Sequence, residues 1–121
     1  MKLITAIIKP EKLDDLIELI SGNGAHGLTV TDVRGFGQQC GQHAAGKAYE
    51  EVAGAAGDRK AAVLLPKIRL DVVVHDDEAE AMADAIAKHV RTGTIGDGKI
   101  WIATVDNAMR IRTGEWGRGA V

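Results

Sequence analysis

Two amphipathic helical patterns, each preceded by an apolar segment of strand character, most constrain how this chain can fold. The first helical stripe is Leu13, Leu16, Ile17 and Ile20, and the second is Ala79, Met82, Ala83, Ile86 and Val90. Segments 3–8, 28–33, 68–74 and 99–105 are rich in β-branched residues or alternate with the two-residue period of a strand. The predicted order is β-α-β-β-α-β, an α+β ferredoxin-like sandwich.

Local signals predict where the two helices begin and end. Pro10 stops the first strand and falls near the first turn of the following helix, where its missing N–H costs little. Gly22-Asn23-Gly24 ends that helix. His75-Asp76-Asp77 opens the second helix, with its acidic residues favourably placed in the first turn.

The two faces of the predicted sheet are not equally covered. Two helices cover one face of a four-stranded sheet, whereas these strands carry apolar residues on both faces. Burial against copies of the same chain covers the second face at least cost, so we expect a homo-oligomer.

Residues 35–59 differ in character from the rest of the chain. They are rich in glycine and alanine, and their sizeable apolar side chains are Phe36, Tyr49 and Val52. Because such a segment buries little apolar surface, we expect a long mobile loop between strands two and three, with a short helix around Lys47–Ala53.

Length and composition set further bounds. The 121 residues predict a single domain, 1–121. A net charge of −2 and the absence of a basic run argue against nucleic-acid binding. Cys40 is the one cysteine, which rules out an internal disulfide. With no signal-like or membrane-spanning apolar run, we expect a cytoplasmic protein.

No catalytic set emerges from the sequence. The four histidines share no metal-ligand spacing, and Cys40-x-x-His43 is at most half of a metal site, or simply two polar residues in a loop. Asp76 and Asp77 are read as helix-start acids rather than a catalytic pair.

The segment Thr92–Trp101 is the clearest candidate for ligand binding. Its glycines let backbone N–H groups approach an anion, and Lys99 supplies a counter-charge. Gly93 to Lys99 matches the GxxxxGK pattern, but Ile100 stands where a P-loop needs Ser or Thr, and the turn leads into a strand. We therefore reject a P-loop NTPase and predict a phosphate-cradling turn of another kind.

Other anion-friendly groups fall at strand ends and loop junctions. They are Gly35-Phe36-Gly37, Lys67, Gly96-Asp97-Gly98-Lys99, Arg110 and Arg112. Together they indicate a polyphosphate site, because guanidinium groups and backbone N–H groups suit that ligand. The alternative for the two arginines is pairing with surface carboxylates.

The chain resembles a known family, the PII signal-transduction proteins of the GlnB/GlnK type. The matching stretches are Met1 to Pro10, Lys12 to Asp15, Gly27 to Thr31, Gly35-Phe36-Gly37, Leu65-Pro66-Lys67, Arg91 to Trp101 and Arg110 to Glu115. The glycine turn and the Arg-Ile-Arg-Thr-Gly-Glu run are specific together. The resemblance implies a homotrimer that binds ATP or ADP in the clefts between subunits.

The resemblance also implies roles for particular residues. The implied nucleotide site comprises Thr29, Gly35, Gly37, Gln38, Gln39, Asp71, Val73, Gly96, Asp97, Gly98, Lys99, Arg110 and Arg112. Gln39 matches the residue that joins ATP in holding Mg²⁺ and 2-oxoglutarate, and Lys67 matches the lysine that pairs with the 2-oxoglutarate carboxylate. Thr29, Asp71 and Val73 match positions near the adenosine, largely supplied by the neighbouring subunit.

Three departures from the family pattern bear on regulation. Gln38 stands where the family usually has Arg, and Asp71 where it usually has Glu. The excursion at about 36–59, called the T-loop in the family, is longer than usual and lacks the Tyr-Arg-Gly-x-x-Tyr run with the modified tyrosine. Tyr49 lies in similar territory, which leaves its modification open.

The resemblance implies a nucleotide-gated regulator and not an enzyme. Its T-loop would control a transporter or enzyme of nitrogen metabolism, such as an ammonium channel, with membrane contact only through that partner. One alternative is a divergent regulator of another transporter that responds to ADP or AMP with bicarbonate, or to a metal at Cys40 and His43. The other is a slow ATP phosphohydrolase that uses Asp97 or Glu115.

Overall fold

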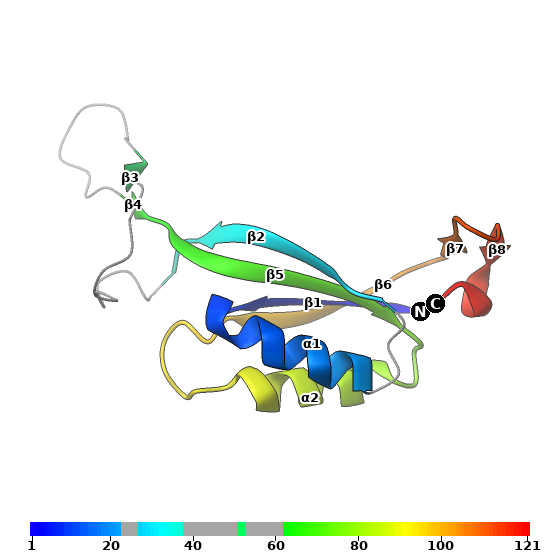
Figure 1. Ribbon diagram of the computed structural model, residues 1–121, viewed down its shortest axis with the longest axis horizontal. Helices are drawn as coiled ribbons and strands as arrows, with labels where there is room; N and C mark the ends of the chain where they lie inside the picture. The colour runs from blue at the N-terminus through cyan, green and yellow to red at the C-terminus, as the bar shows by residue number, and fades with distance from the viewer. Residues whose placement is uncertain (23–26, 38–50, 53–61) are drawn as a thin grey trace.

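The computed structural model describes residues 1–22, 27–37, 51–52 and 62–121 (Figure 1). Its four-stranded sheet has the order β2-β5-β1-β6, and each neighbouring pair is antiparallel. The strands are β1 (Lys2–Ile8), β2 (Thr29–Gly35), β5 (Leu65–Val74) and β6 (Lys99–Thr104), and the helices are α1 (Leu13–Gly22) and α2 (Ala79–Val90). This arrangement confirms the predicted α+β ferredoxin-like sandwich.

Both helices lie against the same face of the sheet (Figure 1). Alternate residues of β1 and β5 point toward them, and the apolar stripes of the helices complete the core. The largest fully buried apolar side chains are Ile4, Ile8, Leu16, Ile20, Leu70, Ile86 and Val72. The apolar residues that follow the two-residue strand period and the 3.6-residue helix period therefore pack into a single core.

The other face of the sheet carries no helix, and we call it the open face. The strand register brings Thr29, Asp71, Thr5 and Trp101 into one row across all four strands. Because directly paired residues share a face, this row lies on the open face, opposite Ile4 and Leu70. Trp101 is 42% exposed there, which leaves a large apolar surface uncovered in a single chain.

Pro10 lies at the start of the first helical segment, as expected, whereas the second helix starts later than predicted. The first helix is preceded by a separate 3-10 turn, η1 (Pro10–Lys12). The second begins at Ala79, and Asp76 instead accepts a 3.0 Å hydrogen bond from the Met1 amino group. This ion pair joins segments distant in sequence, which local helix-start signals do not register.

Short strand pairs extend the fold beyond the sheet. Residues Glu51–Val52 (β3) pair with Ala62–Val63 (β4). The predicted helix is therefore wrong at Glu51–Val52. The other residues of Lys47–Ala53 lie outside the described residues.

A second short strand pair lies near the C-terminus. Met109–Arg110 (β7) and Glu115–Trp116 (β8) pair across a tight turn, followed by the 3-10 turn η2 (Gly117–Ala120). The Arg110 carbonyl accepts hydrogen bonds from Thr113 N and Gly114 N at 3.2 and 2.8 Å. Gly114 has φ of 72°, a conformation that glycine adopts without strain. Arg110-Ile111-Arg112 therefore does not form one extended segment, because Arg110 lies in β7 whereas Ile111 and Arg112 lie in the turn.

No helix among the described residues is both long enough and apolar enough to span a membrane.

Candidate functional site

Two pockets lie at opposite ends of the structure and contain most of the predicted site residues. The first pocket, of about 600 Å³, is lined in part by Thr29, Asp71, Val73 and Arg110. Its lining also includes Ala120 and Val121, so it lies at the end of the structure where the C-terminus and the β7–β8 pair are found (Figure 1). The structure thus brings together the three residues expected near the adenosine with one of the two predicted arginines.

The second pocket, of about 390 Å³, lies where the long loop leaves β2 and returns to β5. Its lining includes Gly35, Gly37, Lys67, Gly96, Gly98 and Lys99. The exposed side chains of Phe36 and Ile95 also line it. The glycine turn and the root of the loop, far apart in sequence, therefore form opposite parts of one concavity.

The sheet register explains why these segments meet. Ile7 of β1 pairs with Lys99 on one side and with Arg69 on the other. Val33 near the end of β2 pairs with Lys67 of β5. The last residues of β2 and the first residues of β5 and β6 consequently lie at the same end of the sheet.

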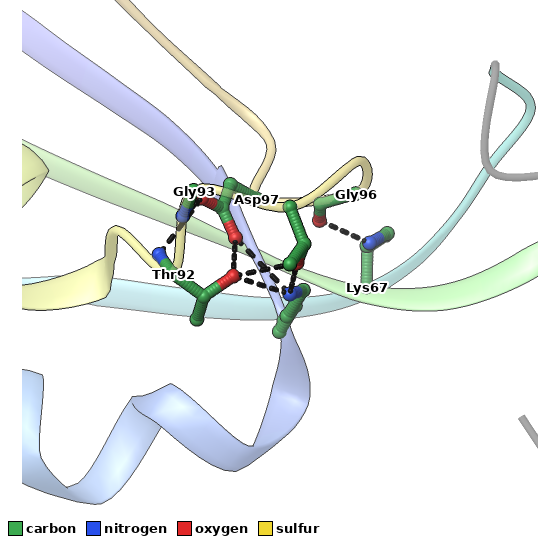
Figure 2. Close-up of polar contacts among 7 residues, drawn as sticks. Lys67, Thr92, Gly93, Gly96 and Asp97 are labelled. Carbon is green, nitrogen blue, oxygen red and sulfur yellow. Dashed lines mark hydrogen bonds and ion pairs between the residues drawn. The ribbon is translucent and has the colours of Figure 1, made fainter.

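Lys67 links β5 to the glycine turn. Its ammonium group donates a 2.7 Å hydrogen bond to the Gly96 carbonyl, as Figure 2 shows. Burial lowers the pKa of Lys67, and the nearby positive charge of Lys9 lowers it further. A cation held in this way, with the second pocket beside it, is suited to an anionic ligand.

Gly98 fixes the turn against the first strand. It has φ of 97°, and a Cβ atom placed there would lie 1.7 Å from the Ile7 carbonyl oxygen. No side chain fits at this distance, so glycine is required by both the backbone conformation and the close approach.

Asp97 lies between two glycines of the second pocket but is not itself part of that lining. One carboxylate oxygen accepts hydrogen bonds from the backbone N–H groups of Thr92 and Gly93, each at 2.8 Å. The other accepts the Thr92 hydroxyl and forms a 3.0 Å ion pair with Lys9 (Figure 2). The hydrogen bonds from the Thr92 hydroxyl and N–H are the main reason that the pKa of Asp97 lies far below its ordinary 3.8.

In the first pocket, Asp71 forms a charged pair on the open face. It accepts hydrogen bonds from Arg69 Nε at 2.8 Å and from the buried Thr5 hydroxyl at 2.5 Å. Burial raises the pKa of Asp71, but the hydrogen bonds from Arg69 and Thr5 outweigh burial and bring the pKa below its ordinary value. Asp71 is therefore an ionised acceptor at neutral pH.

The two predicted arginines are placed differently. Arg110 lines the first pocket and forms a 3.3 Å ion pair with Glu115. Arg112 lies in the turn after β7 and, among the described residues, is not part of either pocket lining. Gln38 and Gln39, the latter being the predicted Mg²⁺ and 2-oxoglutarate ligand, lie outside the described residues, as do Cys40, His43 and Tyr49.

Two residues at these sites were not predicted, Lys9 and Arg69, and Thr92 was predicted only as the first residue of the candidate segment Thr92–Trp101. Arg69 belongs to the alternating polar positions of β5, so the two-residue period of the strand predicts that its side chain lies on the same face as Asp71, the open face. Lys9 and Thr92 carry no separate signal, because their contacts join segments far apart in sequence. In the part of the chain that the structure describes, no group of three or more His, Cys, Asp or Glu side chains could hold a metal ion.

Comparison with known proteins agrees with this arrangement. A family model described as "Nitrogen regulatory protein P-II" matches residues 1–115. A nitrogen regulatory protein P-II from Cereibacter sphaeroides is 48% identical over 121 residues, covering 100% of both chains. Nitrogen regulatory protein GlnK from Escherichia coli K12 is 46% identical over 115 residues, covering 95% of each. Nitrogen regulatory protein P-II 2 from Methanothermobacter thermautotrophicus is 43% identical, covering 100% of this chain and 97% of its own. The chain therefore belongs to the P-II family of nitrogen regulatory proteins.

Proposed function

We propose that this P-II protein is a sensor of ATP and ADP that binds the nucleotide between adjacent copies of a homotrimer. The observation that carries the proposal is the second pocket, where the Gly96–Lys99 turn faces Gly35 and Gly37 with Lys67 beside them. Glycine backbone and two ammonium groups in one concavity match the charge and shape of a polyphosphate. The adenosine would lie against Thr29, Asp71 and Val73 of the neighbouring copy.

The separation of the two pockets supports a site shared between copies. Leu3 of β1 lines the first pocket and Ile7 lines the second. Four residues along a strand correspond to roughly 13 Å. Packing of open faces around a symmetry axis would bring the first pocket of one copy to the second pocket of the next, with Arg110 opposite the glycine turn.

The proposed output is a change in the long loop at about 36–59. Gly37 near its start and Leu65, the first residue of β5 after it, both line the second pocket, so a ligand there would touch the sheet ends on both sides of the loop. A ligand shifts a conformational equilibrium by its differential affinity for the two states, and contacts at the loop root provide such a difference. The loop would then engage or release a target, such as an ammonium channel or another transporter, in the cytoplasm.

Mg²⁺ and 2-oxoglutarate are the proposed co-ligands. Lys67 supplies a cation for a carboxylate, and the amide oxygen of Gln39 with phosphate oxygens would form a hard-ligand set suited to Mg²⁺. When bound, Mg²⁺ would supply a positive charge beside the phosphates, with Gln39 as its protein ligand and Lys67 orienting the carboxylate of the co-ligand.

A regulatory role fits the carboxylates better than hydrolysis does. A general base must be able to accept a proton from an attacking water. Asp97 is saturated with internal hydrogen bonds and its pKa is strongly lowered, and Glu115 is paired with Arg110. We therefore propose that the protein does not act as an ATP phosphohydrolase.

Isothermal titration calorimetry tests the proposal directly. Wild-type protein should bind ATP and ADP with micromolar or tighter affinity. Lys99→Ala and Arg110→Ala should each weaken ATP binding by about 1–2 kcal/mol, because each removes a charge-assisted hydrogen bond to phosphate. Lys88→Ala, an exposed lysine on α2, is the matched control and should bind like wild type.

A second titration separates the possible co-ligands. With Mg²⁺ and ATP present, 2-oxoglutarate should bind to wild type, and Lys67→Met should abolish that binding. Bicarbonate titrated with ADP or AMP is the parallel arm. Absence of ATP and ADP binding to wild type would reject the nucleotide-sensor proposal, whereas a bicarbonate response in place of 2-oxoglutarate would reject the co-ligand alone.

A further inference from the structure

A compact polar cluster stands behind the glycine turn, and we call it the Asp97 cluster: Lys9, Thr92, Gly93, Thr94 and Asp97. Its members come from the end of β1 and from the segment that joins α2 to β6. Thr92, Gly93 and Asp97 are gathered on one side in Figure 2, while Lys67 meets Gly96 separately.

Lys9 connects this segment to the first strand. Its ammonium group contacts Asp97 Oδ1 at 3.0 Å and donates to the Thr92 and Thr94 hydroxyls at 2.9 and 3.0 Å. The Lys9 and Asp97 side chains are only 15% and 23% exposed. The ion pair is thus partly shielded from water, and every donor of the ammonium group has a partner.

The cluster adjoins the proposed phosphate site without lining its pocket. Asp97 lines a third cavity of about 220 Å³ behind the turn, together with Arg91 and Ala87. Its immediate neighbours Gly96 and Gly98 line the second pocket. The third cavity shares Ile7, Gly98 and Lys99 with the second pocket, so Asp97 lies next to the proposed phosphate site without lining it.

Such a turn needs to be held in place. Gly93, Gly96 and Gly98 all have positive φ, and a glycine-rich segment loses much conformational entropy when it is ordered. Three contacts constrain the segment: Asp97 accepts hydrogen bonds from Thr92 and Gly93, Lys9 pairs with Asp97, and Lys99 pairs with Ile7 of β1 in the sheet. Ordering before the ligand arrives removes that cost from binding.

We propose that Asp97 and Lys9 are positioning residues for the phosphate-binding turn. The Asp97 carboxylate, neutralised by Lys9, holds segment 92–97 in the shape that presents the backbone of Gly96–Lys99 to phosphate, and neither side chain touches the ligand. This inference rests on the proposed nucleotide function and assigns Asp97 a different role from direct phosphate contact.

The positioning role makes a prediction that simple destabilisation does not. Loss of the cluster should weaken ligands with a phosphate tail and leave binding of adenosine unchanged, because adenosine would be held at the first pocket. A fold-wide loss of structure would instead weaken both ligands together and lower the melting temperature.

The test compares Asp97→Ala and Lys9→Met with wild type in titrations of ATP and adenosine, alongside thermal melting. Each variant should bind ATP about 10-fold more weakly, with adenosine affinity unchanged. Lys9→Arg, which restores the positive charge, should recover most of the ATP affinity. Asp84→Asn, an exposed carboxylate on α2, is the matched control.

Amide hydrogen exchange provides a readout independent of ligand. In unliganded Asp97→Ala, the amides of Thr92 and Gly93 should exchange faster, whereas those of central β1 should not change.

Wild-type ATP affinity in both variants would overturn the inference and leave the proposed function standing. A loss in Lys9→Met without a loss in Asp97→Ala would also overturn it, since Lys9 would then be acting as a direct ligand. Failure of wild type itself to bind ATP would reject the proposed function.

Discussion

Asp97 illustrates how a single carboxylate can organise a segment that has no regular secondary structure. Two backbone N–H groups, a hydroxyl and an ammonium group converge on its two oxygens. Hydrogen bonds to an ionised acceptor are stronger than neutral ones, and each favours the charged form over the protonated form. The strongly lowered pKa of Asp97 is thus another expression of the contacts that hold the turn.

This lowered pKa predicts how stability changes in acid. An aspartate whose folded pKa lies below its unfolded value stabilises the fold fully above the unfolded pKa, and this contribution is lost as the pH falls toward the folded pKa. The advantage of wild type over Asp97→Asn should therefore be constant from pH 7 to about 5 and shrink below pH 4. Urea denaturation at pH 7, 5, 4 and 3 measures it.

Comparison with a variant is essential here, because Asp71 and Asp76 also have lowered pKa values and contribute to the total acid dependence. Asp84→Asn serves as the control, and its difference from wild type should stay small across the series. A wild-type advantage over Asp97→Asn that persists undiminished at pH 3 would contradict the proposed source of stability.

Among the elements, β5 contributes most to the site, since it lies between β2 and β1 and carries both Lys67 and Asp71 on its open face. Thr5 lies directly across from Asp71 on β1 and is fully buried even in a single chain. The Asp71 carboxylate is the acceptor for its hydroxyl, at 2.5 Å. The two side chains therefore form one cross-strand unit.

Removal of both members of this unit should cost less than the sum of the two single removals. Asp71→Ala leaves the Thr5 hydroxyl buried without this acceptor, and we expect a loss of about 1–3 kcal/mol in the free energy of unfolding. The double variant Asp71→Ala with Thr5→Val should be less destabilised than the sum of the single variants. Chemical denaturation of all four proteins at pH 7 measures the coupling, and strictly additive losses would show that the two groups do not cooperate.

Elements with a clear period could be predicted from the sequence, and those without one could not. The apolar stripes of α1 and α2 and the alternation in β5 follow directly from burial on one face. The pairs β3–β4 and β7–β8 have two residues per strand, too few to show any period. The turn after Arg110 includes Gly114 with its positive φ, and the spacing of the two arginines gives no indication of such a turn.

The candidate site was predictable in its composition but less so in its assembly. Glycines and lysines at strand ends indicated anion binding, and the structure gathers Gly35, Gly96 and Lys99 into one pocket. Asp97 does not line that pocket, and its ion-pair partner Lys9, which is distant in sequence, is brought to it only by the fold. Pairwise tertiary contacts of this kind leave no periodic trace in a sequence.

Among the described residues, the open face of the sheet is not covered by any helix of the single chain (Figure 1). The open face presents Trp101 and Thr29 at its edges, and both pockets adjoin it. Exposed apolar surface of this kind marks an interaction site. A closed symmetric assembly would bury it and complete the two pockets at the same interface, which links oligomerisation to ligand binding.

This link predicts that assembly and nucleotide binding fail together. Wild-type protein should sediment as a trimer whose mass does not change over a wide range of concentrations. Trp101→Glu places a charge within the expected interface, where an unpaired charge is costly to bury, and should yield monomers that retain the circular dichroism of the wild-type fold. These monomers should lose ATP binding, because the first pocket of a neighbour is then absent.

Lys88→Gln makes the same change in net charge on the helical side and should leave both properties unchanged. A wild-type monomer that binds ATP normally would show that one chain forms the whole site, and a Trp101→Glu monomer with wild-type affinity would separate binding from assembly.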